Sequence, residues 1–182
     1  MLSLKNKVCA ITGAGSGIGR ATAVLLAKRG CHLALSDVNE QGLAETVAQC
    51  NTLGVRVTQQ KLDVAQRDAM YAWAEQVVTD HGSVNILVNN AGVALGATVE
   101  AMRWEYFEWL MGVNFWGPLC GIRTFVPRML ARKEGCHIVT TSSTDGVLFG
   151  SGNVYAVTKM AVSGLMEALR HELRTTNIGT SN

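Results

Sequence analysis

The sequence contains little proline, little charge and few aromatic residues. Two prolines in 182 residues mark no linker, so we expect residues 1–182 to form a single domain. Charged residues make up 16% of the chain and hydrophobic residues 48%, a composition that excludes intrinsic disorder. The 16 Lys and Arg are scattered and nearly balanced by 14 Asp and Glu, which predicts no nucleic-acid partner.

The chain also lacks an apolar segment suited to a membrane. Its longest uncharged run, residues 82–99, is interrupted by asparagines and glycines, and residues 1–5 do not begin an apolar signal core. We therefore predict no membrane association, no secretion and a cytoplasmic location.

Cysteine and histidine show no pattern typical of a disulfide framework or a metal site. The five cysteines are odd in number and form no Cys-x-x-Cys pair, and the histidines have no partner at ligand spacing. Cys9, Cys31 and Cys136 fall in apolar runs and are expected to be small buried residues. The sequence predicts no bound metal and a reducing compartment.

Short apolar runs alternate with longer segments of helical periodicity. The expected strands are residues 8–12, 31–36, 55–60, 85–88 and 136–141, and the expected helices are 17–30, 39–53, 64–81, 99–115, 117–132 and 153–175. This alternation predicts an α/β fold with a doubly wound parallel sheet, Rossmann-like, and helices on both faces.

The end of the sequence departs from that pattern. Ile178 follows the last expected helix and looks like the first residue of a sixth strand, but only four residues remain after it. A doubly wound sheet normally includes that strand. We expect the last strands to be missing and the domain to be incomplete at its C-terminus.

Residues 12–19, TGAGSGIG, lie between the first expected strand and the first expected helix. Glycine permits a tight turn and the close approach of backbone amides and a helix N-terminus to a pyrophosphate. The segment therefore predicts a dinucleotide site, with an ordinary glycine-rich turn as the alternative. The candidate cofactor-binding residues are Gly13, Gly15, Ser16, Gly17, Ile18 and Gly19.

Asp37 ends the second expected strand and is the candidate for contact with the adenosine ribose. A carboxylate at this position accepts hydrogen bonds from ribose hydroxyls and repels a 2′-phosphate. NAD is therefore favoured over NADP. The alternative is that Asp37 only caps the helix expected to start at Asn39.

Tyr155 and Lys159 are four residues apart in the last expected helix, which places both side chains on one face. A neighbouring ammonium favours the ionised form of a phenol, so this tyrosine could exchange a proton with an alcohol or a carbonyl. Ser142 and Ser143 end the fifth expected strand, where ligands bind in an open α/β sheet. The alternative for the serines is an ordinary role at the end of a strand.

Together these residues resemble the motifs of the short-chain dehydrogenase/reductase family in its compact form. TGAGSGIG matches the family's TGxxxGxG, and residues 89–92 match its NNAG segment. Asn114, Ser143, Tyr155 and Lys159 follow the order of its catalytic tetrad. The resemblance implies an oxidoreductase that transfers hydride between NAD(P) and a secondary alcohol or ketone. Its further implied cofactor contacts are Asp63, Val64, Asn90, Ala91, Gly92, Tyr155 and Lys159.

The resemblance also implies a role for each catalytic residue. Tyr155 would be the general acid/base, and Lys159 would promote its ionisation and bind the nicotinamide ribose. Ser143 would orient the substrate oxygen, and Asn114 would hold a water molecule linking Lys159 to solvent. Thr12 would brace the NNAG segment.

The choice of serine depends on two competing patterns. Tyr155 follows Ser142 by thirteen positions, the interval common in the family, and follows Ser143 by twelve. The pattern Ser-x-x-Gly ending at Gly146 selects Ser143 and implies a loop one residue shorter. We predict Ser143, with Ser142 as the alternative.

The family continues beyond this point with a sixth strand, a substrate-covering lobe and a seventh strand, none of which we expect here. Without them, the substrate and nicotinamide would be poorly positioned, and misplaced reactants react slowly. The alternative function is therefore a catalytically impaired truncated variant that binds nucleotide weakly or pairs with a full-length subunit.

Aromatic residues concentrate in the segment 104–116. Trp104, Trp109 and Trp116, with two further aromatic residues, could form a substrate wall, or they could be core or subunit-contact residues. In the resembled family the last two expected helices commonly form subunit contacts, which implies a homodimer or homotetramer. The expected partner of the site is a small alcohol or carbonyl compound.

Overall fold

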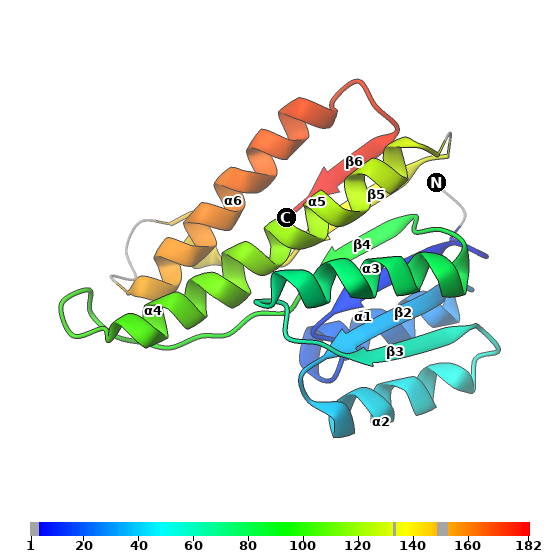
Figure 1. Ribbon diagram of the computed structural model, residues 1–182, viewed down its shortest axis with the longest axis horizontal. Coiled ribbons are helices and arrows are strands. Elements are labelled where there is room, and N and C mark those ends of the chain that lie inside the picture. The colour runs from blue at the N-terminus through cyan, green and yellow to red at the C-terminus, as the bar shows by residue number, and fades with distance from the viewer. Residues whose placement is uncertain (1–3, 133, 149–152) are drawn as a thin grey trace.

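The computed structural model describes residues 4–132, 134–148 and 153–182. Six strands form one sheet in the order β3-β2-β1-β4-β5-β6, and each neighbouring pair is parallel (Figure 1). The strands are β1 (Val8–Thr12), β2 (His32–Asp37), β3 (Val57–Lys61), β4 (Ile86–Asn89), β5 (Cys136–Thr140) and β6 (Ile178–Ser181). The helices are α1 (Gly17–Lys28), α2 (Glu40–Asn51), α3 (Arg67–His81), α4 (Trp104–Met111), α5 (Gly117–Leu130) and α6 (Val154–Leu173). The predicted doubly wound, Rossmann-like α/β fold is confirmed.

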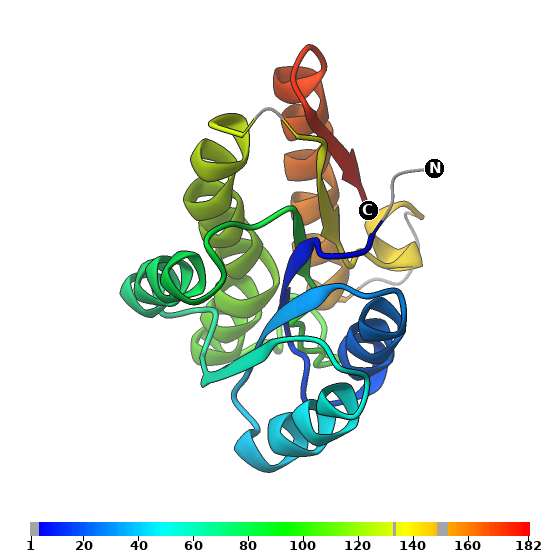
Figure 2. The ribbon, with the colours of Figure 1, turned by 90° about the vertical axis from the view of Figure 1, so that its right-hand side faces the viewer.

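Two hydrophobic cores lie on opposite faces of the sheet. One contains apolar residues of α1 and α2, and the other contains those of α3, α5 and α6 (Figure 2). Successive residues of β1 alternate between them: Cys9 and Ile11 pack with the first, and Val8 and Ala10 with the second. Side chains alternate sides along a strand, so a strand covered on both faces is apolar throughout. This explains why the central strands were predictable as apolar runs.

The expectation that the sixth strand is missing is wrong. Ile178–Ser181 form β6, which pairs with β5 and covers its edge. Only Ile178 of this strand is buried, so its sequence has no apolar run. Its backbone pairing and the 2.6 Å contact between His137 Nε2 and Ser181 Oγ hold it in place.

Several helix boundaries also differ from the prediction. Asn39, not Asp37, caps α2, because its side chain accepts a hydrogen bond from Gly42 N at 3.0 Å. The helix expected to begin at residue 64 begins at Arg67. The helix expected from residue 99 begins at Trp104 and continues into α5 through a π-helical turn, Gly112–Trp116.

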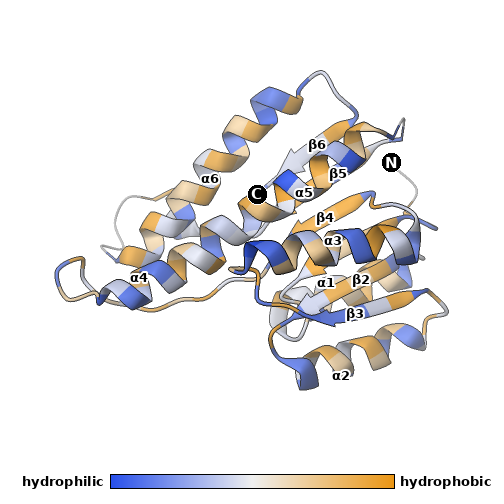
Figure 3. Cartoon of the chain, in the orientation of Figure 1, coloured by the Kyte–Doolittle hydropathy of each residue, from blue (hydrophilic) through white to orange (hydrophobic). Residues whose placement is uncertain are grey.

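Figure 3 shows the chain coloured by hydropathy, with β4 largely hydrophobic and the edge strand β3 largely hydrophilic.

Within the described residues, no helix combines the length and apolar character needed to cross a membrane. All five cysteines are free and buried, which confirms the interpretation of Cys9, Cys31 and Cys136 as small buried residues.

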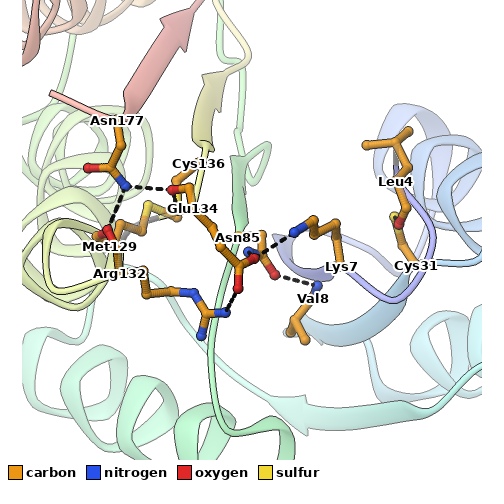
Figure 4. Close-up of polar contacts among 10 residues, drawn as sticks. All are labelled: Leu4, Lys7, Val8, Cys31, Asn85, Met129, Arg132, Glu134, Cys136 and Asn177. Carbon is orange, nitrogen blue, oxygen red and sulfur yellow. Dashed lines mark hydrogen bonds and ion pairs between the residues drawn. The ribbon is translucent and has the colours of Figure 1, made fainter. Parts of the chain in front are cut away.

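A polar cluster joins the amino ends of four strands (Figure 4). Glu134, before β5, pairs with Lys7 at 2.5 Å and with Arg132 at 2.7 Å. Asn85 accepts a hydrogen bond from the first amide of β1 at 3.0 Å, and Asn177 donates to three carbonyls at 2.6–3.1 Å. These contacts fix the strands at the edge of the sheet opposite to the candidate site.

Candidate functional site

The glycine-rich turn joins β1 to α1 at the carboxyl edge of the sheet, and Gly13 and Gly19 have no room for a side chain. Gly13 has φ +66°, and a Cβ atom on it would lie 2.7 Å from Ala91 Cα. A Cβ atom on Gly19 would lie 2.0 Å from the Gly13 carbonyl oxygen. Such a turn exposes backbone at the start of a helix, which is the environment a pyrophosphate requires.

Asp37, at the end of β2, is bound to the same turn. Its Oδ2 accepts a hydrogen bond from Gly15 N at 2.7 Å, and its Oδ1 accepts one from Asn39 N at 2.9 Å. Asp37 forms no ion pair with any residue that the structure describes. A carboxylate without a cationic partner remains free to accept hydrogen bonds from a diol.

The segment after β4 is braced against the glycine turn. Thr12 Oγ1 accepts hydrogen bonds from the Asn90 and Ala91 amides, both at 3.1 Å. Asn90 Nδ2 in turn donates to the carbonyls of Thr12 at 3.2 Å and Gly13 at 3.0 Å. These contacts position the ends of β1 and β4 as one unit.

Asn114 lies in the π-helical turn and ties α4 and α5 to the rest of the site. Its Oδ1 accepts from Val93 N, and its Nδ2 donates to Val93 O, both at 2.9 Å. Nδ2 also donates to Thr158 Oγ1 at 3.0 Å. The side chain is buried, so these bonds fix the segment after β4 against α6.

Lys159 is buried on α6, and its Nζ donates to the Thr141 carbonyl oxygen at 2.9 Å. The same Nζ lies 5.7 Å from the centre of the Tyr155 ring. Burial lowers the pKa of Lys159, because the charged form is less stable away from water. The site therefore holds a cation beside a phenol at the carboxyl edge of the sheet.

The two candidate serines have different surroundings. Ser142 Oγ is 2.7 Å from Ser163 Oγ of α6. Ser143 Oγ accepts a hydrogen bond from Asp145 N at 3.2 Å, at the start of a short 3₁₀ turn. Ser142 lines the cavity described next, and Ser143 is not among its lining residues.

A cavity of about 680 Å³ runs along this edge of the sheet. Most of the predicted cofactor-binding residues line it: Gly13, Ser16, Gly17, Ile18, Asp37, Asp63, Val64, Asn90, Ala91, Gly92, Tyr155 and Lys159. Gly15, Gly19, Asn114 and Ser143 do not line it and contact or adjoin the residues that do. The glycine turn, Asp37 and the Tyr155–Lys159 pair thus face one cavity.

Sequence reasoning missed several lining residues: Val38, Leu62, Val93, Ala94, Val113 and Thr141. Val38, Leu62 and Thr141 directly follow strands, which was a usable signal. Trp109 also lines the cavity, four residues before Val113 on the same helical surface. Trp104, Trp109 and Trp116 are 77%, 44% and 52% exposed, so of the alternatives left open for them the core role is wrong. Figure 1 shows that α4 extends beyond the sheet, where no strand covers it.

Comparison with known proteins agrees with these features. The family model described as short chain dehydrogenase matches residues 7–182. The putative oxidoreductase SadH of Mycobacterium tuberculosis is 44% identical over 174 residues, which are 95% of this chain and 63% of SadH. This chain therefore spans less than two thirds of the length of that relative.

Solved structures show the same similarity. A short-chain dehydrogenase/reductase from Burkholderia phymatum, in complex with NAD, is 38% identical with a TM-score of 0.96, over 100% of this chain and 66% of its own. Carveol dehydrogenase from Mycobacterium avium, also in complex with NAD, is 29% identical with a TM-score of 0.90, over 96% of this chain and 68% of its own. The fold, the arrangement of the site and these matches show that the chain belongs to the short-chain dehydrogenase/reductase family of oxidoreductases.

Proposed function

We propose that residues 1–182 act as one NAD-binding domain and carry the catalytic groups of a dehydrogenase for a secondary alcohol or ketone. The observation that best supports this is that Tyr155 and Lys159 line the same cavity as the glycine turn and Asp37. The relative named carveol dehydrogenase acts, by its name, on an alcohol and was solved with NAD.

Asp37 supports a preference for NAD over NADP. Asp37 lines the cavity together with Ser16 and Ile18, and its carboxylate pairs with no cation among the described residues. A ribose diol can donate hydrogen bonds to a carboxylate, whereas a 2′-phosphate is repelled by it. The adenosine ribose would therefore lie at Asp37 and the nicotinamide ribose at Lys159.

The nicotinamide, when bound, supplies the hydride chemistry. In this proposal, the Tyr155 hydroxyl gives a proton to the substrate carbonyl oxygen or takes one from an alcohol. The Lys159 ammonium stabilises the negative charge that develops on the phenol oxygen. Thr141 holds that ammonium at 2.9 Å, and Asn114 fixes the adjoining segment through Val93.

Ser142 lines the cavity and Ser143 does not, but the hydrogen bonds around the two serines support Ser143 as the residue that orients the substrate oxygen. Its hydroxyl accepts from Asp145 N, which leaves its own proton free to donate. The Ser142 hydroxyl is shared with Ser163 Oγ at 2.7 Å.

The test is turnover of secondary alcohols with NAD by the purified 182-residue chain. Tyr155→Phe is expected to lower turnover by about 100-fold or more while NADH still binds, because it removes only the proton-exchanging group. Full turnover by this variant would contradict the assigned mechanism. NADH binding without turnover in the unmodified chain would support the alternative of a catalytically impaired variant.

A paired substitution tests the choice of serine. Ser143→Ala should lower turnover, whereas Ser142→Ala should have the smaller effect because Ser142 is engaged with Ser163. The reverse order would assign the role to Ser142.

We also propose that the chain forms a homodimer or homotetramer. Trp104 and Trp116 expose large apolar surfaces, and such surfaces mark sites of association. A monomer in sedimentation measurements would contradict this proposal.

A further inference from the structure

Arg20, in the first turn of α1, contacts the back of the glycine-rich turn. Its Nη2 donates to the Gly15 carbonyl at 2.6 Å and to the Gly42 carbonyl at 3.1 Å. The same side chain contacts Thr46 through Nε at 3.0 Å and pairs with Glu45 at 2.9 Å. One guanidinium therefore joins the glycine turn to three residues of α2, with the two hydrogens of Nη2 shared among three acceptors.

The two consecutive peptide groups on either side of Gly15 differ in the hydrogen bonds of their carbonyl and N–H groups. In the peptide between Ala14 and Gly15, the carbonyl accepts from Thr46 Oγ1 at 2.8 Å, and the N–H donates to Asp37 Oδ2 at 2.7 Å. In the peptide between Gly15 and Ser16, Arg20 holds the carbonyl. A trans peptide directs its N–H opposite to its carbonyl, so the Ser16 N–H points away from Arg20. Ser16 is one of the residues that line the cavity.

We propose that Arg20 is a positioning residue for the cofactor: by holding the Gly15 carbonyl against α2, it directs the Ser16 N–H toward an oxygen of the adenosine diphosphate half of NAD. The proposal rests on the proposed function of the cavity. Arg20 acts through the backbone and needs no contact with the nucleotide. The positive charge of Arg20 is paired with Glu45. In this proposal, the adenosine ribose therefore contacts the negative charge of Asp37 and not the positive charge of Arg20.

A purely structural role for Arg20 makes a different prediction. If Arg20 only joined α1 to α2, its loss would lower stability without a specific loss of nucleotide affinity. If it positions the turn, ligands that contain adenosine diphosphate should bind more weakly, whether or not they contain nicotinamide. ADP, which lacks both nicotinamide and its ribose, therefore separates the two roles.

The experiment is calorimetric titration of the 182-residue chain with NADH and with ADP. For Arg20→Ala, we expect both dissociation constants to rise by about tenfold, the size expected for loss of a charged hydrogen bond. Arg20→Lys keeps the charge but cannot reach all the acceptors at once, so a smaller rise is expected. This milder variant keeps the test available if Arg20→Ala does not fold.

Two controls localise the effect. Arg29→Ala removes an exposed arginine just after the end of α1 and should leave both constants unchanged. Lys159→Met should weaken NADH but not ADP, because ADP lacks the nicotinamide and the ribose that we place at Lys159. Wild-type affinity in a folded Arg20→Ala or in Arg20→Lys would overturn the proposal about Arg20 alone. Failure of the unmodified chain to bind either ligand would overturn the proposed function, and the role of Arg20 with it.

Discussion

At the residue scale, Lys159 combines a buried charge with a central position in the site. Its side chain is 4% exposed, and burial lowers its pKa. An ammonium held in such a place makes the folded chain less stable than an apolar side chain of the same shape would, unless the lost hydration is fully replaced. The burial of this charge does not favour stability, which is consistent with the role in binding and catalysis that we propose for Lys159.

Replacing Lys159 with methionine should separate these two effects. We expect Lys159→Met to lower turnover by about 100-fold or more, because it removes the cation beside the proton-exchanging phenol. We also expect the free energy of unfolding to rise at pH 7. Because the folded-state pKa of Lys159 is lowered, the unfolded chain binds more protons between the two pKa values, and wild-type stability rises with pH there. The advantage of Lys159→Met should therefore shrink as the pH approaches the ordinary lysine value of 10.5.

Urea unfolding at a series of pH values from neutral to alkaline measures this difference. Lys28→Met, in the exposed last turn of α1, is the control and should show no comparable pH dependence. A Lys159→Met variant that is less stable than the wild type at neutral pH would contradict the argument.

At the scale of the element, β6 depends on the absence of a side chain at Gly179. A Cβ atom at this position would lie 2.6 Å from His137 Nδ1. The His137 ring would have to turn away and lose its 2.6 Å contact with Ser181 Oγ. We expect Gly179→Ala to destabilise the chain by about 1 kcal/mol, the size of a lost hydrogen bond.

Gly164→Ala is the matched control for this change. Gly164 lies inside α6, and an added Cβ atom meets nothing within 4 Å. The same substitution there should stabilise the chain by about 0.5–1 kcal/mol, because alanine favours the helix. Thermal unfolding of both variants tests the contrast, and a stabilising Gly179→Ala would show that β6 is not held as described.

The burial of each element explains whether the sequence could predict it. β1 was predicted with its observed limits, because both of its faces are buried and every residue is apolar or small. β6 was not, because only Ile178 is buried and the strand depends on its neighbour β5. The π-helical turn was not predicted either. It contains Asn114, whose side chain is hydrogen-bonded to Val93, and this contact between residues far apart in the sequence gives no local pattern.

The residues of the candidate site were also predictable only in part. Residues in local motifs, such as the glycine turn and Tyr155, were predictable because their spacing alone implies a shared surface. Trp109 was not assignable, because its place in the cavity depends on how α4 is directed relative to the sheet. The contacts of Arg20 with α2 also depend on helix packing and not on any motif.

At the scale of the whole molecule, the cavity spans both halves of the doubly wound sheet, from Asp37 after β2 to Tyr155 on α6. A ligand that contacts both halves binds the folded chain and not the unfolded one, so it must raise the stability of the fold. At a concentration of about 100 times the dissociation constant, the gain is about 2.7 kcal/mol. For a chain of this length, each kcal/mol corresponds to a rise of about 2–4 °C in Tm.

NAD should therefore raise the Tm of the chain by more than NADP does at equal concentration, because the 2′-phosphate of NADP meets the Asp37 carboxylate. Asp37→Asn keeps an oxygen to accept from Gly15 N but removes the negative charge. In this variant, the shift with NAD should become smaller, and the difference between the two nucleotides should narrow. Equal shifts with NAD and NADP in the unmodified chain would contradict the preference assigned to Asp37, and no shift with either would contradict nucleotide binding in the cavity.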